Sequence, residues 1–262
     1  MLVYYSRVWR QLTVMAFSST LSNRIDSAGY FLGKFVRFGF FIVFIFSLFR
    51  VTSSIAGYSK YEVLLFFFVF NLVDVVAQGL FRGIYVFRNQ VRTGTFDFVL
   101  TRPLRSLFYV LFQLSDLLDL LFLIPIVVGL IYVIFHLPVF PSSIQLFLFG
   151  LFFFVSLLIL TSFHIIAATI MVRYVDADQA VWLYRDFMTL GRFPPEILSG
   201  GLQFFFTILI PIIVVVAFPT KILLGILSPL WMLVGIVIAA LFFLISLLLW
   251  NSGLKQYSSA SS

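Results

Sequence analysis

The sequence contains no cysteine and very little charge. Only 10% of its 262 residues are charged, whereas a soluble domain of this length carries about 25%. Without cysteine, disulfide frameworks and thiolate metal or redox centres are excluded. The chain has two histidines and contains neither H-E-x-x-H nor G-x-S-x-G, so it offers no recognisable set of catalytic residues. We therefore predict no catalytic residue and no bound metal or cofactor in this chain.

Apolar residues fill the space that the missing charge leaves. They make up 62% of the chain, which includes 36 Phe, and the mean hydropathy is +1.14. These values are typical of an integral membrane protein in contact with membrane lipids. The net charge of +7 is then interpreted through the positive-inside rule and not as nucleic-acid binding.

Six apolar runs are long enough to cross the hydrocarbon core, which takes about 20 helical residues. The sequence thus predicts an all-α polytopic membrane protein that forms one permease domain over residues 1–262, with about six transmembrane helices. A helix over residues 1–27 carries arginines beside an apolar face and is expected to lie in the membrane interface, or else to be a solvated lead-in. The predicted spans are Phe31–Phe49, Tyr61–Phe81, Phe108–Phe135, Ile144–Met171, Ile197–Phe218 and Pro229–Trp250.

Basic residues predict the orientation, because cytoplasmic loops retain Lys and Arg. With a cytoplasmic N-terminus, fourteen of the 17 Lys and Arg lie in inside segments. Both termini are therefore expected in the cytoplasm. The inside set is Arg7, Arg10, Arg24, Lys34, Arg37, Arg82, Arg88, Arg92, Arg102, Arg105, Arg173, Arg185, Arg192 and Lys255.

A polar island, VRTGTFDFVLTRPLRSL, separates the second and third predicted spans. Phe96, Val99 and Leu100 give a short helix an apolar face, and Arg102-Pro103 ends that helix. An inert connector would need only a few residues. Residues 90–106 therefore suggest a surface helix that presents a docking surface.

This island resembles a segment of ATP-binding-cassette permeases of the type-two exporter superfamily, in a bacterial branch with the pattern G-x-[LF]-D-x-x-L-x-R-P. "GRFP" at 191–194 and "FPTKILLG" at 218–225 resemble two later motifs of that branch, although "PPEI" at 194–197 departs from it. The similarity covers most of the chain in order and spacing. The residues that match the first motif, with the neighbouring Arg92, would contact the ATPase: Arg92, Gly94, Phe96, Asp97, Leu100, Arg102 and Pro103.

The resemblance implies a permease that is driven by a separate cytoplasmic ATPase and works as a dimer with a second permease chain, identical or different. It also implies an exporter in a bacterial inner membrane, surrounded by membrane lipids, with ATP and Mg²⁺ bound by the partner. The residues independently support such a partner, because the chain has no G-x-x-x-x-G-K-[ST] phosphate loop.

A second irregular segment follows the fifth predicted span. It is too short to cross and too apolar for an exposed loop, with Pro219 after Phe218 expected to break the span and Gly225 available for a turn. Residues 218–228 therefore suggest an extracellular re-entrant hairpin. A simple interfacial loop is an equally weighted alternative.

Carboxylates inside the spans are the remaining signals. Asn71, Asp74 and Gln78 form a polar stripe on one helix, and Asp116 and Asp119 share a face of the next span. They are candidates for a translocation pathway or gate. The alternative is pairing between helices, for example with Arg82 or Arg88. His164 is expected to be a hydrogen-bonded core residue.

Residues 173–192 are interpreted as a cytoplasmic loop with mixed charge, which could form a second contact with the ATPase. Asp176 and Asp178 have no further ligand nearby and do not suggest a metal site. An ion- or proton-coupled secondary carrier or channel remains the rival function, because Asp74 could bind the coupling ion.

Overall fold

The computed structural model describes residues 2–174 and 179–257 and confirms the all-α prediction, with no strand in those ranges. Asp176, Asp178 and the last five residues lie outside the described residues. The helices are α1 Leu2–Ser22, α2 Arg24–Val51, α3 Lys60–Phe81, α4 Ile84–Arg92, α5 Phe96–Leu100, α6 Ser106–Phe112, α7 Leu117–Phe135, α8 Ser143–Arg173, α9 Gln179–Met188, η1 Thr189–Arg192, η2 Pro195–Ile197, α10 Gly200–Phe204, η3 Phe205–Leu209, α11 Ile212–Leu223 and α12 Pro229–Lys255.

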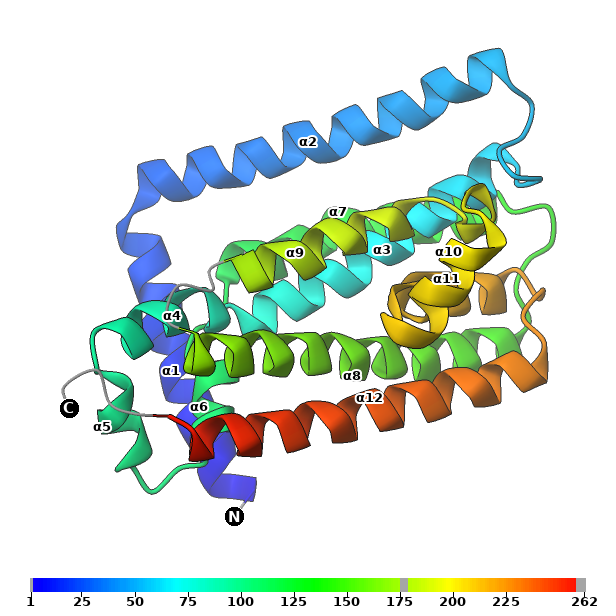
Figure 1. The fold of residues 1–262 in the computed structure, drawn as a ribbon. Coiled ribbons are helices and arrows are strands. Elements are labelled where there is room, and N and C mark those ends of the chain that lie inside the picture. The colour runs from blue at the N-terminus through cyan, green and yellow to red at the C-terminus, as the bar shows by residue number, and fades with distance from the viewer. Residues whose placement is uncertain (1, 175–178, 258–262) are drawn as a thin grey trace.

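Within the described residues, five helical segments are long and apolar enough to cross a membrane, and a bent pair gives a sixth candidate. The chain is therefore a multi-pass membrane protein. The five segments are formed by α2, α3 together with α4, α7, α8 and α12. They run along one common direction (Figure 1).

The bundle has two distinct ends (Figure 1). The end that carries α4, α5 and α6 is called the α5 end, and the end with the loops α2–α3, α7–α8 and α11–α12 is called the α10 end. α1 crosses the α5 end, where its Tyr5 ring packs edge-on against Phe108 with centroids 4.7 Å apart. Its Thr13 hydroxyl lies 3.2 Å from that of Ser115. The N-terminal helix is thus held against the bundle at this end.

α3 is the central helix of the fold. In the most apolar stretch of the segment formed by α3 and α4, 72% of the residues are buried. α3 begins where Glu62 accepts a hydrogen bond from the Ser59 backbone amide at 2.7 Å, a favourable N-terminal arrangement. By contrast, α2 is only 6% buried and lies apart from the other helices (Figure 1). Phenylalanine contacts attach it, including Phe41 stacked on Phe67 at 4.7 Å. Some of the 36 Phe therefore hold helices together and do not face lipid.

The third predicted span, Phe108–Phe135, is wrong as a single helix. It is broken between α6 and α7, where Asp116 becomes the N-cap of α7 and accepts the backbone amides of Leu118 and Asp119 at 2.8 and 3.2 Å. Asp116 also donates its own backbone N–H to the Gly79 carbonyl. A carboxylate that caps a helix satisfies amide groups that would otherwise be unpaired. The crossing helix therefore starts nine residues later than predicted.

The fifth predicted span, Ile197–Phe218, is also wrong. Arg173 at the end of α8 donates to Ser252 near the α5 end, whereas Glu196 accepts from Tyr58 in the α2–α3 loop at the α10 end. The segment between them, α9 to η2, therefore runs from one end of the bundle to the other (Figure 1). The sequence predicted this segment to be a cytoplasmic loop. Because it instead runs along the bundle, Arg185 and Arg192 no longer belong to the predicted inside set.

α10 and α11 instead form a re-entrant hairpin at the α10 end. The two helical pieces Gly200–Leu209 and Ile212–Leu223 meet at an angle of 101°. Both ends of this segment lie together, because Lys221 pairs with Glu196. α11 has 12 residues and is about 18 Å long, too short to cross. Irregular backbone at this depth is tolerated because α11 is buried in protein.

The predicted position of the hairpin, residues 218–228, is wrong. Phe218 and Pro219 lie inside α11, and the bend falls at Pro211. Pro219 has no N–H to donate to the carbonyl of Val215 four residues earlier, but the Ser156 hydroxyl of α8 lies 2.7 Å from that oxygen. The helix can therefore continue through the proline. Gly225, with φ of +72°, lies in the turn after α11, as the sequence suggested.

Close packing of α3 against α7 depends on Gly129. A Cβ atom at this position would overlap the ring of Phe68. We expect Gly129→Ala to lower the free energy of unfolding by about 1–3 kcal/mol, because overpacking a tight contact displaces the ring or the helix. Thermal denaturation of the purified protein in detergent measures the effect. Gly150→Ala on α8, where a Cβ meets nothing within 4 Å, is the matched control, and equal melting of the two variants would contradict the packing.

Candidate coupling surface and central cavity

α5 is held against the bundle by its inner side. The Phe96 ring is fully buried and packs edge-on against Phe87 at 5.0 Å and Tyr257 at 5.3 Å. Asp97 accepts a hydrogen bond from the Tyr257 hydroxyl at 2.9 Å. Gly94 makes the turn between α4 and α5 with φ of +71°, a conformation that costs other residues about 1–2 kcal/mol. Three residues of the motif therefore have structural roles in positioning α5.

Tyr257 joins α5 to the segment after α12. Burial, together with the hydrogen bond to Asp97, raises the pKa of the Tyr257 phenol to about 12. The phenol therefore remains a donor at neutral pH. Its contribution to stability is complete below pH 10 and is lost as the pH rises towards 12.

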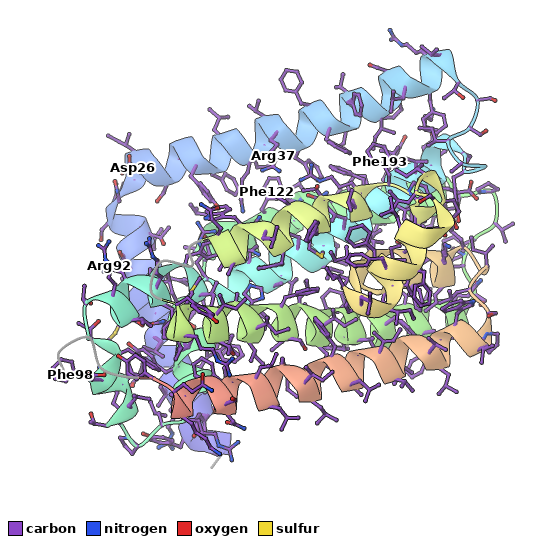
Figure 2. The ribbon with its side chains drawn as sticks, viewed as in Figure 1. Asp26, Arg37, Arg92, Phe98, Phe122 and Phe193 are labelled. Carbon is purple, nitrogen blue, oxygen red and sulfur yellow. The ribbon has the colours of Figure 1, made fainter. Side chains whose placement is uncertain are left out.

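The outer side of α5 is exposed. The Phe98 side chain is 69% exposed and Leu100 is 42% exposed, and Figure 2 shows Phe98 pointing away from the rest of the molecule. Of the predicted apolar face of Phe96, Val99 and Leu100, only Leu100 is available for docking, because Phe96 and Val99 are buried against the bundle. We define the coupling surface by its exposed members, Arg92, Phe98, Leu100, Arg102 and Pro103.

A second feature is a cavity of about 220 Å³ between α2, α3, α7 and the segment α9–η1, called the central cavity. Of the predicted pathway candidates, Asn71, Asp74, Gln78 and Asp119 line it, whereas Asp116 does not. The remaining lining residues are Tyr30, Lys34, Arg37, Phe38, Phe41, Phe67, Phe70, Val75, Arg82, Phe122, Trp182, Arg185, Asp186, Thr189 and Arg192.

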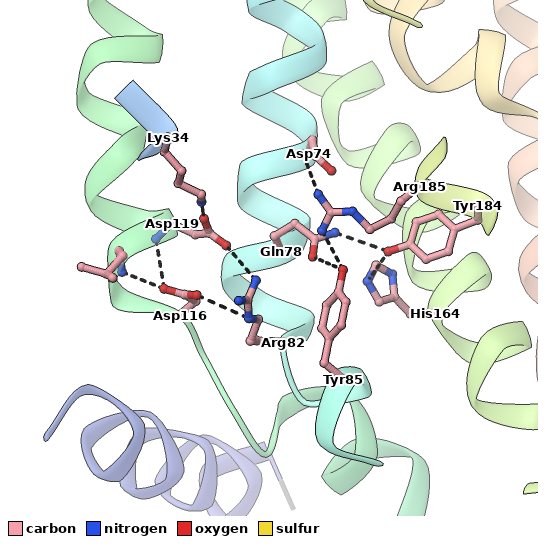
Figure 3. Close-up of polar contacts among 11 residues, drawn as sticks. Lys34, Asp74, Gln78, Arg82, Tyr85, Asp116, Asp119, His164, Tyr184 and Arg185 are labelled. Carbon is pink, nitrogen blue, oxygen red and sulfur yellow. Dashed lines mark hydrogen bonds and ion pairs between the residues drawn. The ribbon is translucent and has the colours of Figure 1, made fainter. Parts of the chain in front are cut away.

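Carboxylates at the start of α7 are paired with cations from neighbouring helices (Figure 3). Asp119 is 1% exposed and pairs with Lys34 of α2. Arg82, at the end of α3, lies 3.5 Å from Asp116 and 3.8 Å from Asp119. Both carboxylates also lie at the positive N-terminal end of α7, which favours negative charge. The predicted pairing between helices is therefore present here, with Arg82 as one of the two cations.

The polar stripe of α3 meets α9 and not the arginines proposed from sequence. Asp74 lies 3.7 Å from Arg185 of α9. Arg185 also donates to the Tyr85 hydroxyl at 2.6 Å, and Tyr85 donates to the Gln78 side chain at 2.8 Å. Asn71 donates to its own helix, at the carbonyl of Phe67. An ionised Asp74 inside a span is thus stabilised by a cation from another helix.

A chain of hydrogen bonds continues from Gln78 into the core (Figure 3). Gln78 donates to Tyr184 at 3.3 Å, and the Tyr184 hydroxyl lies 2.9 Å from Nε2 of His164. Nδ1 of His164 lies 2.7 Å from the Leu160 carbonyl. Since a carbonyl only accepts, Nδ1 carries the proton and Tyr184 donates to Nε2. His164 is therefore the hydrogen-bonded core residue that the sequence predicted.

Two arginines of the cavity have no carboxylate partner among the described residues. The Arg192 guanidinium lies 5.1 Å from the centre of the Phe41 ring and 4.9 Å from that of Phe70, and its Nε is buried without a hydrogen bond. Arg37 is exposed on α2, on the side facing the bundle (Figure 2). Both guanidinium groups line the same cavity.

Sequence reasoning missed Trp182, Arg185 and Arg192 as cavity residues because their segment was interpreted as a solvated loop. A signal was present in the spacing. Val181, Tyr184 and Met188 recur at helical intervals and are all buried, which indicates an amphipathic helix with one face inside the protein.

At the α10 end, Glu196 joins three segments of the chain. It accepts from the Tyr58 hydroxyl at 3.2 Å and pairs with Lys221 of α11. Burial and the neighbouring Glu196 carboxylate raise the pKa of the Tyr58 phenol well above its usual value. The "PPEI" stretch, which departs from the motif expected by resemblance, thus fastens the hairpin to the α2–α3 loop. In the described ranges no group of three His, Asp or Glu side chains could hold a metal ion.

The Asp74–Arg185 pair predicts a coupled response to mutation. Asp74→Asn and Arg185→Gln should each lower the free energy of unfolding by about 1–3 kcal/mol, because each leaves a partly buried charge unpaired. The double variant should lose less than the sum, with a coupling energy of about 0.5–2 kcal/mol. Thermal denaturation in detergent gives all three values. Asp186→Asn, with an exposed carboxylate, is the control, and strict additivity would show that the pair contributes nothing.

Comparison with known proteins agrees with this architecture. Residues 35–261 match the family described as ABC-2 family transporter protein. No curated protein and no solved structure matches the chain. The match covers most of α2, the other membrane helices, the coupling surface and all the cavity-lining residues except Tyr30 and Lys34. Members of this family function with an ATP-binding subunit. The chain therefore belongs to the ABC-2 transporter family and is a membrane-spanning permease subunit of an ABC transporter.

Proposed function

We propose that this permease is part of an exporter, and that its ATPase docks on the coupling surface. The observation that carries the proposal is the two-sided character of α5. Phe96 and Asp97 fasten its inner side to the bundle, whereas Phe98 and Leu100 extend from its outer side. An exposed apolar pair beside Arg92 and Arg102 fits a groove in a partner protein.

The route from this surface to the cavity supports a role in energy coupling. α5 follows α4 through the Gly94 turn, and α4 continues α3 after a short break at Arg82–Gly83. Tyr85 of α4 and Gln78 of α3 are hydrogen-bonded to each other. A force applied to Phe98 therefore acts on a segment that also carries the cavity wall. ATP and Mg²⁺ would be bound by the partner alone, because this chain has no phosphate-binding loop.

The proposal includes a second permease chain, identical or different. The central cavity is incompletely enclosed by one chain, since its lining residue Trp182 is 52% exposed and few residues of α2 are fully buried. A second chain could complete the pathway. The resemblance to type-two exporters supports outward transport across a bacterial inner membrane, with the α5 end and both termini in the cytoplasm. In that arrangement the hairpin α10–α11 lies at the outer side.

The ion-coupled carrier is less well supported by the geometry. Asp74, its best candidate for an ion site, is paired with Arg185. Transport in proteoliposomes that contain the ATPase should therefore require ATP and should not respond to an imposed proton or sodium gradient. Transport that follows the gradient without ATP would overturn the proposed function.

Removing the exposed apolar side chains should prevent docking. We expect Phe98→Asp or Leu100→Asp to reduce copurification of the ATPase at least about tenfold, because a buried hot-spot contact commonly contributes 2 kcal/mol or more. Yield and melting temperature of the permease should be unchanged, because both side chains are exposed. Quantitative immunoblotting after affinity purification measures the loss.

Val139→Asp is the control for this experiment. It introduces the same charge at a residue that is 79% exposed in the loop between α7 and α8, at the α10 end. Asp97→Arg should act indirectly, by removing the hydrogen bond to Tyr257, and should lower the melting temperature as well. Normal ATPase recovery with both Phe98→Asp and Leu100→Asp would reject the coupling surface.

The proposed orientation predicts a labelling pattern that the cysteine-free sequence makes simple to measure. A single Thr101→Cys, beside the coupling surface, should react with a membrane-impermeant maleimide in inverted vesicles and not in intact spheroplasts. A single Val139→Cys should show the opposite pattern. If Thr101→Cys reacts from the outside, no cytoplasmic ATPase could reach α5.

A further inference from the structure

The central cavity combines positive charge with aromatic walls. Its lining includes five cations, Lys34, Arg37, Arg82, Arg185 and Arg192, and three carboxylates, Asp74, Asp119 and Asp186, so the charged lining has a net charge of +2. The neighbouring Asp116, which pairs with Arg82, reduces the local excess to +1. The aromatic members are Tyr30, Phe38, Phe41, Phe67, Phe70, Phe122 and Trp182. A purely structural ion-pair network would not require an excess of cations.

The five cations differ in whether a carboxylate neutralises them. Lys34, Arg82 and Arg185 each pair with a carboxylate. Arg37 and Arg192 pair with none in the described part of the chain, although both line this cavity, and the Nε atom of Arg192 is buried without a hydrogen bond. A partly buried guanidinium without a carboxylate partner is unfavourable, and an anion that enters the cavity between Arg192 and the exposed Arg37 would remove this cost. The guanidinium group is well suited to bidentate contacts with phosphate or carboxylate.

Aromatic side chains lie against Arg192. The Arg192 guanidinium lies over the rings of both Phe41 and Phe70, which keeps the side chain extended into the cavity. Phe67 stacks on Phe41 beside it. A ligand whose charge meets Arg37 and Arg192 therefore meets apolar rings with its adjacent atoms.

We propose that the central cavity binds an amphiphile with an anionic headgroup, phosphate or carboxylate, held between Arg37 and Arg192. The first part of its apolar chain would lie against Phe41 and Phe67. The cavity of about 220 Å³ is smaller than the roughly 300–1,000 Å³ of most pockets for drug-sized ligands. The rest of the ligand's apolar tail would therefore extend past the exposed Trp182. The assignment of this amphiphile as transported substrate rests on the proposed exporter function.

The binding test uses the full chain in phosphatidylcholine nanodiscs and radiolabelled octyl phosphate, by equilibrium dialysis, with empty nanodiscs subtracted. We expect saturable binding of about one molecule per chain. Octyl glucoside and octyltrimethylammonium, which share the tail, and inorganic phosphate, which lacks it, should each compete at least about tenfold more weakly. Equal competition by octyl glucoside, or by inorganic phosphate, would overturn the proposal, because the headgroup or the tail would then be irrelevant.

Variants locate the site. Arg37→Gln and Arg192→Gln should each weaken octyl phosphate binding about tenfold, since each removes charge-assisted hydrogen bonds. Arg50→Gln is the matched control, because Arg50 lies on α2 but lines a different hollow, beside Lys60, and binding should change less than about twofold. Arg192→Lys, which keeps the charge, should retain most binding and guards against misfolding of Arg192→Gln. Unchanged binding in Arg37→Gln and Arg192→Gln would reject the site.

Two further experiments distinguish a bilayer lipid from a transported amphiphile, and the cavity proposal from the proposed exporter function. Displacement by dioleoyl phosphatidylglycerol in the nanodisc supports the headgroup chemistry and assigns the site to a bilayer lipid, whereas octyl phosphate that stays bound points to a transported amphiphile. Binding that persists in Phe98→Asp after the ATPase is lost shows that the site is independent of docking. If the ATPase copurifies normally but octyl phosphate does not bind, the cavity proposal fails while the exporter function stands.

Discussion

The ion pair between Asp74 and Arg185 determines the course of the chain through the bundle. A carboxylate in the central helix is costly in a membrane unless a cation lies beside it, and the structure supplies that cation from α9. α9 must therefore run inside the protein, where Tyr184 is buried against His164 and Gln78. The apolar stretch that follows is then left to form a hairpin that begins and ends at the α10 end. One pairing thus explains both the polar crossing and the apolar re-entrant segment.

The same arrangement connects the cavity to the coupling surface. Arg82 ends α3 and holds the start of α7 through Asp116 and Asp119, while Tyr85 in the next helix is bonded to Arg185. Residues within one turn of the α3–α4 break therefore contact three helices around the cavity. A displacement of α5 that tilts α4 would act on these contacts first. Packed helix interfaces have discrete arrangements and do not deform continuously, so such a displacement would shift these contacts between alternative partners.

The sequence predicted the parts of the fold that depend on long apolar runs. The span at Ile144–Met171 appears as α8 with ends only one and two residues away, and Pro229–Trp250 lies within α12, because twenty consecutive apolar residues have few alternatives to a membrane helix. The motif around Gly94 also predicted local structure correctly, because a glycine permits the turn before α5 and a proline disfavours continuation of the helix after it. The sequence could not separate Phe96 from Phe98, because which side of a five-residue helix is buried depends on residues far along the chain, such as Tyr257.

The errors have a common physical origin in pairing between distant segments. Residues 179–192 contain Trp, Arg and Asp and appear to be a loop until Asp74 is known to lie opposite Arg185. Pro219 appears to end a helix until Ser156 is found 2.7 Å from the carbonyl that the proline leaves without a donor. A prediction from local propensity assumes that water or lipid surrounds each residue. This assumption fails inside a bundle, where another helix supplies the hydrogen-bond or ion-pair partner. Polar and proline-containing segments of a membrane protein are therefore the places where tertiary contacts decide the structure, and here they surround the cavity in which Arg37 and Arg192 remain without a carboxylate in the described chain.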